Sequence, residues 1–109
     1  MLETEDEAGR DIEVWEDLAE SALTRSADDL ILARLLAVYG TALRTRSRMQ
    51  EAFVALRRVL ELRRRHADER PDLVGSALYT LGTTHLMAEQ MDEGLALIAE
   101  AMAVWRDTL

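Results

Sequence analysis

The sequence predicts an all-α protein of about five helices that fold back on one another as antiparallel hairpins within a single domain. The 109 residues contain only one Pro and five Gly, so few helix breakers interrupt the chain. Apolar residues recur at helical spacing in five segments joined by short turns, which favours hairpins of neighbouring helices. One residue pattern also occurs twice, 42 residues apart, which indicates an internal structural repeat.

The first helix is expected from about residue 11 to residue 25. Its apolar stripe includes Trp15 and Leu18, and acidic side chains occupy the other face, as in an amphipathic helix. Ser26 then begins a capping-box sequence, in which the hydroxyl accepts from an orphan backbone amide. The second helix is therefore expected at about residues 28–46.

Helix-start signals also mark the other three helices. Ser47 begins a second capping-box sequence, so the third helix should run from about residue 48 to residue 66. Pro71 suits the first turn of a fourth helix, because its missing N–H has no partner there in any case. Asp92 should start the fifth helix, which is expected to end near residue 107.

The repeated pattern places one small residue on the first helix of each hairpin and another on the second. Gly40 should face Ala52, and Gly82 should face Gly94, so that the two backbones approach closely while larger apolar side chains interlock around them. The two copies read Leu36-x-x-Tyr39-Gly40-x-x-Leu43 with Ala52-x-x-x-Leu56-x-x-Val59, and Leu78-x-x-Leu81-Gly82-x-x-His85 with Gly94-x-x-x-Ile98-x-x-Ala101.

This pattern resembles the tetratricopeptide repeat (TPR), W-x₂-L-G-x₂-Y followed by A-x₃-F, although Leu replaces Trp in both copies. The 42-residue pitch resembles the long, kinesin-light-chain-like subclass, which is widespread in bacterial signalling proteins. The resemblance implies a right-handed solenoid of helix hairpins forming one domain over residues 1–109. It would comprise a half repeat at about 10–26 and repeats at about 28–66 and 71–108. A generic helical bundle is the alternative.

The resemblance also implies a concave groove, lined by the first helix of each hairpin, where extended peptides dock. Its two guanidinium groups would suit an acidic or carboxylate-bearing peptide. The carboxylate clamp of the family uses Lys and Asn, and this chain contains neither, so that mode does not transfer. A merely solvated face is the alternative. The groove residues implied are Arg34, Thr41, Arg44, Ser76, Tyr79, Thr83 and Met87, together with Ala37, Thr45 and Leu86.

The fifth helix is apolar on nearly all sides, and Glu100 is its only charge between residues 95 and 105. Such a helix is expected to be buried on more than one face. We therefore expect a homodimer that forms through this helix. There are two alternatives: another protein docks on this helix, or the Ala-rich positions of the helix are simply exposed. The residues expected to mediate self-association are Leu95, Ile98, Met102 and Trp105.

Charge is distributed unevenly around a net charge of −8. Residues 1–29 carry eleven acidic and two basic side chains. Residues 30–70 carry four acidic and ten basic side chains, and residues 71–109 carry six acidic and one basic. Arg-rich sequence can neutralise phosphates. The overall negative charge and the scarcity of aromatic residues among the arginines nevertheless argue against nucleic acid as a partner. An Arg-rich, nucleic-acid-binding helical protein is the remaining alternative.

Catalysis, cofactors and metal ions are not expected. The chain has no Cys and only two His, His66 and His85, and neither belongs to a ligand motif. An enzyme would need a site made of carboxylates alone. The first residues have no signal-peptide character, and no stretch approaches about 20 apolar residues. We therefore expect a cytoplasmic, non-catalytic module for protein–protein interaction and assembly, not a membrane protein.

Overall fold

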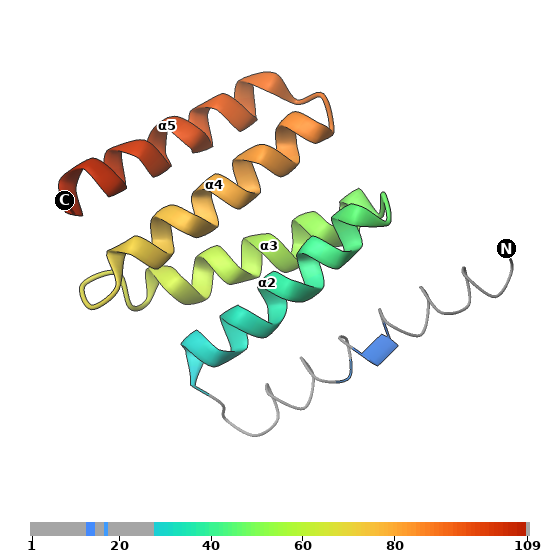
Figure 1. Ribbon diagram of the computed structural model, residues 1–109, viewed down its shortest axis with the longest axis horizontal. Helices are drawn as coiled ribbons and strands as arrows, with labels where there is room; N and C mark the ends of the chain where they lie inside the picture. The colour runs from blue at the N-terminus through green and yellow to red at the C-terminus, as the bar shows by residue number, and fades with distance from the viewer. Residues whose placement is uncertain (1–12, 15–16, 18–27, 109) are drawn as a thin grey trace, which may run out of the picture.

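A computed structural model describes residues 13–14, 17 and 28–108 of the chain, and all regular structure in them is helical (Figure 1). The all-α class is therefore confirmed for these residues. The helix expected at about 11–25 lies outside the described residues except for three positions. The other helices begin and end close to where the sequence places them: α2 (Asp29–Thr45), α3 (Met49–Arg64), α4 (Pro71–Met87) and α5 (Met91–Thr108).

Local sequence explains where α2 and α4 begin. The Asp28 carboxylate accepts a hydrogen bond from the Leu30 amide at 2.8 Å and so caps α2, which satisfies one orphan donor of the first turn. Pro71 is in the first turn of α4, as expected. Ser26, the cap expected for α2, lies outside the described residues.

The expected cap of α3 was wrong, because Ser47 ends α2 instead of starting α3. Its backbone is left-handed, with φ of 63°, and the Arg48 amide donates back to the Leu43 carbonyl at 2.9 Å. This is the usual way for a residue beyond a helix C-terminus to satisfy the last carbonyls. Arg48 is then the N-cap of α3, without a side-chain capping bond.

The same turn recurs 42 residues later. Glu89 also has φ of 63°, and the Gln90 amide donates to the His85 carbonyl at 2.9 Å. The first hydrogen bonds of the second helix in each hairpin match as well. The Ala52 amide donates to the Arg48 carbonyl, and the Gly94 amide donates to the Gln90 carbonyl, each at 3.0 Å. The repeat seen in the sequence therefore extends to the backbone geometry of both hairpin turns.

Each helix packs against the next one along the chain: α2 on α3, α3 on α4, and α4 on α5. Consecutive helices run in opposite directions, so α2 and α4 point the same way (Figure 1). One apolar core passes through all four helices, because burying a stripe of each helix removes its apolar surface from water. Its buried members include Leu32, Leu36, Phe53, Leu56, Val59, Leu62, Val74, Leu78, Leu81 and Ala101.

The small residues of the repeat lie at helix contacts, as the sequence predicts. A Cβ atom placed on Gly82 would lie 2.9 Å from the Gly94 carbonyl oxygen, so the α4 and α5 backbones touch there. At Gly40 the nearest atoms belong to Leu56 and Ala55, not to the expected Ala52. Because the first hairpin has Ala where the second has Gly, its helices meet through side chains and not through backbone.

Candidate functional site

The residues expected to line a groove are distributed along one side of α2 and α4. Arg34 and Thr41 are exposed on α2, and Ser76, Tyr79 and Met87 are exposed on α4. Arg44 and Thr83 are half-buried. Since α2 and α4 run in the same direction, these side chains form two roughly parallel rows.

Arg44 ties the two rows together near their C-terminal ends. Its Nη1 atom donates to the hydroxyl oxygens of Thr83 at 3.3 Å and Thr84 at 3.2 Å. Both hydroxyls donate in turn to the Thr80 carbonyl, at 2.9 and 2.7 Å. Arg44 and Thr83, both among the residues expected to line a groove, are thus in contact, and part of the donor capacity of Arg44 is used within the chain.

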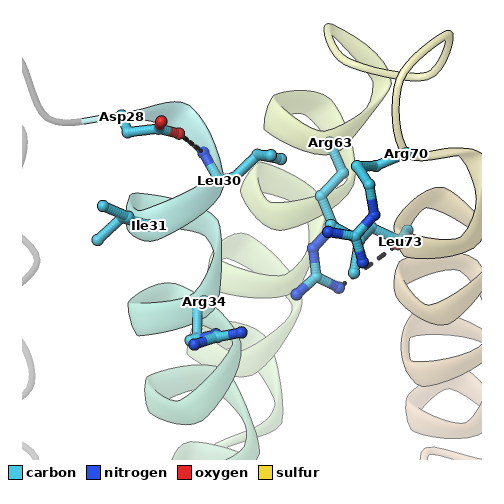
Figure 2. A pocket seen from close by; sticks show the side chains of 7 residues that line it. All are labelled: Asp28, Leu30, Ile31, Arg34, Arg63, Arg70 and Leu73. Carbon is cyan, nitrogen blue, oxygen red and sulfur yellow. Dashed lines mark hydrogen bonds between the residues drawn. The ribbon is translucent and has the colours of Figure 1, made fainter.

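At the N-terminal end of the same two helices lies a cavity of about 290 Å³, which we call the arginine pocket (Figure 2). Arg34 of α2, Arg63 of α3 and Arg70 at the start of α4 surround its opening. The remaining lining residues are Asp28, Leu30, Ile31 and Leu73.

Arg63 is the most constrained of the three arginines. Its Nη1 atom donates to the Leu73 carbonyl at 3.5 Å, whereas its Nε atom is buried and has no hydrogen-bond partner among the described residues. Burial lowers the pKa of Arg63, and the positive charges of Arg34 and Arg70 lower it further, while Asp72 opposes this effect. The charged guanidinium is therefore held where desolvation and like charge both disfavour it.

Two acidic side chains beside the arginine pocket, Asp72 and Asp28, are already engaged. Asp72 accepts from Arg70 Nε at 3.1 Å and from Nη2 at 2.9 Å, and hydrogen bonding from Arg70 lowers the pKa of Asp72. Asp28 accepts from the Leu30 amide. Within the part of the chain that the structure describes, Arg34 forms no hydrogen bond or ion pair with another residue.

Sequence reasoning named Arg34 but missed Arg63 and Arg70. These two arginines are separated by the short connection between α3 and α4, and the reversal of the chain returns them to the same opening (Figure 2). The available signal was an Arg close to the end of one helix followed by an Arg immediately before Pro71, the first residue of the next.

The four residues expected to mediate self-association divide between two faces of α5. Ile98 packs on Gly82, and the Trp105 indole packs on Gly75 and lies 5.8 Å from the Tyr79 ring. Leu95 and Met102 are exposed, at 53% and 62% of their surface. Within residues 28–108, only one face of α5 is packed, against α4, and the second face that the sequence expects to be covered is exposed.

The exposed face of α5 corresponds to a covered face of α3. Leu95 and Met102 lie 42 residues after Phe53 and Leu60, which are only 2% and 7% exposed. The ring of His85, on α4, lies 4.5 Å from that of Phe53, so α4 covers this face of α3. No element among residues 28–108 covers the equivalent face of α5 in the same way.

Both histidines have packing and hydrogen-bonding roles. His85 Nδ1 lies 2.6 Å from the Gln90 side-chain oxygen, and His66 Nε2 lies 3.1 Å from an Asp29 carboxylate oxygen. Among the described residues, no group of His, Asp or Glu side chains could hold a metal ion, and no helix has the length and apolar character to span a bilayer.

Comparisons with known proteins add no relative. No family model matches the sequence, and neither curated proteins nor solved structures show significant similarity to it.

Proposed function

We propose that the protein is a non-catalytic module for protein–protein interaction and assembly, built as a right-handed TPR-type solenoid. Three observations support the repeat architecture: the matching left-handed turns at Ser47 and Glu89, the helix contacts at Gly40 and Gly82, and the packing of each helix on the next. Nearest-neighbour packing of repeated hairpins is what distinguishes a solenoid from a closed bundle.

The proposed assembly function rests on a difference in exposure between equivalent faces of α3 and α5. Phe53 and Leu60 are buried under α4, whereas their equivalents Leu95 and Met102 face solvent. An apolar surface that one repeat covers and the next leaves open is a docking surface in a stacked architecture.

A second copy of the chain is the occupant that we propose for this surface. Met91, Leu95, Ala99 and Met102 form an exposed stripe along α5, which we call the α5 stripe. Two such stripes are self-complementary in an antiparallel pair, because each Met91 then meets the partner's Met102 and each Leu95 the small Ala99. A symmetric dimer requires this self-complementarity.

The proposal is tested by placing a charge in the α5 stripe. Met102→Glu should produce a monomer with unchanged helicity, because the side chain is exposed in the isolated fold and would be buried in the dimer. Val54→Glu is the matched control, since Val54 is 68% exposed on α3 and lies outside the stripe. A Met102→Glu protein that keeps the molar mass of the native chain would contradict self-association through α5.

Binding of an acidic peptide between α2 and α4 is the second proposed activity. It is supported by Arg34, which is exposed and unpaired among the described residues. A fluorescent oligoglutamate peptide should bind, and Arg34→Ala should weaken its binding about tenfold, while Arg58→Ala should not change it. Equal affinity of all three proteins would argue against the groove.

Nucleic acid is a weaker candidate, because much of the positive charge of α3 is already paired. Arg58 and Arg65 contact Glu61, and Arg64 contacts Glu100. Arg57 lies over the ring of Phe53 at 5.4 Å. Neutralising the phosphates of a nucleic acid requires a strip of free guanidinium groups. The surface of α3 does not present such a strip.

A further inference from the structure

We infer that the arginine pocket is a binding site for a phosphate monoester, held by Arg34, Arg63 and Arg70. The inference goes beyond the proposed function, since a small anionic group in this pocket needs neither a peptide along the groove nor a second copy on α5.

The three guanidinium groups of the arginine pocket belong to different parts of the chain. They come from α2, the end of α3 and the start of α4, and all three line one cavity (Figure 2). Donors that approach from three elements suit a tetrahedral group with three terminal oxygens. A carboxylate offers only two oxygens in one plane, which suits a single guanidinium fork.

Arg63 also has an unsatisfied hydrogen-bond donor. Its Nε atom is buried without a hydrogen-bond partner among the described residues, although buried polar groups are nearly always paired. A phosphate group in the cavity would offer the Arg63 guanidinium an acceptor that the chain does not supply, and Nε would reach it by a turn of the side chain toward the cavity, since Nε is covered in the free protein. The negative charge of the phosphate would also offset the mutual repulsion of Arg63 with Arg34 and Arg70, which adds to the larger effect of burial in lowering the pKa of Arg63 in the free protein.

The remaining lining residues fit an ester better than a bare ion. Leu30, Ile31 and Leu73 supply apolar surface beside the arginines, where the organic part of the ligand would lie. The two nearby carboxylates do not occupy the arginines fully: Asp28 accepts from the Leu30 amide, and the only one of the three arginines that donates to Asp72 is Arg70, through Nε and Nη2.

The test follows the Nε–Hε resonances of the arginine side chains by NMR during titration of the full chain with inorganic phosphate and then phosphoserine. At constant ionic strength, the Arg63 resonance should shift saturably, with a half-saturation concentration at least tenfold lower for phosphate than for acetate. Equal responses to phosphate and acetate, or an equal shift of every arginine, would overturn the proposal.

Variants separate a binding role from a structural one. Arg34→Gln should raise the half-saturation concentration at least tenfold, whereas Arg58→Gln, on the exposed side of α3, should leave it unchanged. Arg63→Met should abolish binding without lowering the thermal midpoint, because it removes a partly desolvated charge that forms no ion pair among the described residues and only a long hydrogen bond, to the Leu73 carbonyl. Undiminished phosphate binding by Arg34→Gln would overturn the proposal even if Arg63→Met failed to fold.

A last comparison identifies the source of the phosphate. A phosphoserine peptide that binds much more tightly than free phosphoserine would indicate a phosphate carried by a protein partner. Equal affinities would indicate a small phosphorylated molecule. Both results support the monoester site, and failure of both ligands to bind would contradict it. None of these measurements depends on the oligomeric state or on oligoglutamate binding, so failure of the proposed function would be recognised separately.

Discussion

Gly40 and Gly82 occupy equivalent positions in the two hairpins, but a methyl group added at each would meet different atoms. At Gly82 it would lie 2.9 Å from the Gly94 carbonyl oxygen and 3.2 Å from the Ile98 amide nitrogen, both backbone atoms. At Gly40 it would meet the Leu56 side chain, at 2.8 Å from Cδ2 and 2.9 Å from Cγ; this side chain is buried in the core but can shift more easily than backbone atoms.

We therefore predict that Gly82→Ala lowers the free energy of unfolding by about 1–3 kcal/mol, because the α4 and α5 backbones must separate. Gly40→Ala should lower it less, because a side chain can shift where a backbone cannot and because a gain in helix propensity of up to about 1 kcal/mol offsets part of the cost of moving Leu56. Urea denaturation measures both values. Equal losses at the two positions would contradict the difference between the hairpins.

The turn residues support a second prediction at the residue scale. Ser47 and Glu89 are left-handed without being glycine, a conformation that costs a residue with a side chain about 1–2 kcal/mol. Ser47→Gly and Glu89→Gly should each raise the free energy of unfolding, by about 0.5–1 kcal/mol once the greater freedom of glycine in the unfolded chain is counted. Chemical denaturation provides the measurement, and destabilisation by both changes would mean that the turns are not strained.

The sequence was informative about small residues and uninformative about the arginine pocket. Gly82 and Gly94 were predicted to meet because their spacing repeats, and they do. Arg63 and Arg70 belong to no repeated or periodic pattern. Their proximity depends on how the connection between α3 and α4 reverses the chain, which residue spacing does not specify.

At the scale of elements, α5 divides into a face that packs on α4 and the α5 stripe. The sequence could not separate the two, because both consist of large apolar residues. Gly75 on α4 determines which face of α5 packs, because the absence of a side chain there leaves room for the Trp105 indole. Pairs of this kind depend on three-dimensional fit and leave no periodic signal.

This division predicts different costs for substitutions on the two faces of α5. In the monomeric Met102→Glu background, adding Trp105→Ala should lower the free energy of unfolding by about 2–4 kcal/mol, because packing on Gly75 and Tyr79 is lost. Adding Leu95→Ala should change it by no more than about 0.5 kcal/mol, as at other exposed positions. Denaturant titrations followed by circular dichroism measure both. Similar losses would show that both faces are buried in the monomer.

At the scale of the whole molecule, a single core joins both hairpins. The two repeats should therefore unfold together, although repeat architectures with weaker interfaces can unfold in parts. Native-state hydrogen exchange should give similar opening free energies for the most protected amides of α3 and α4. A much lower value in one hairpin would indicate that the repeats are energetically separate.

The most direct test of the account is the absolute molar mass of the native chain, measured by light scattering after size exclusion over a wide concentration range. Self-association through the α5 stripe predicts a mass close to twice 12.3 kDa at high concentration, falling toward the single-chain value on dilution. A mass of 12.3 kDa at every concentration would contradict the claim that a second copy covers the face of α5 that the repeat leaves open.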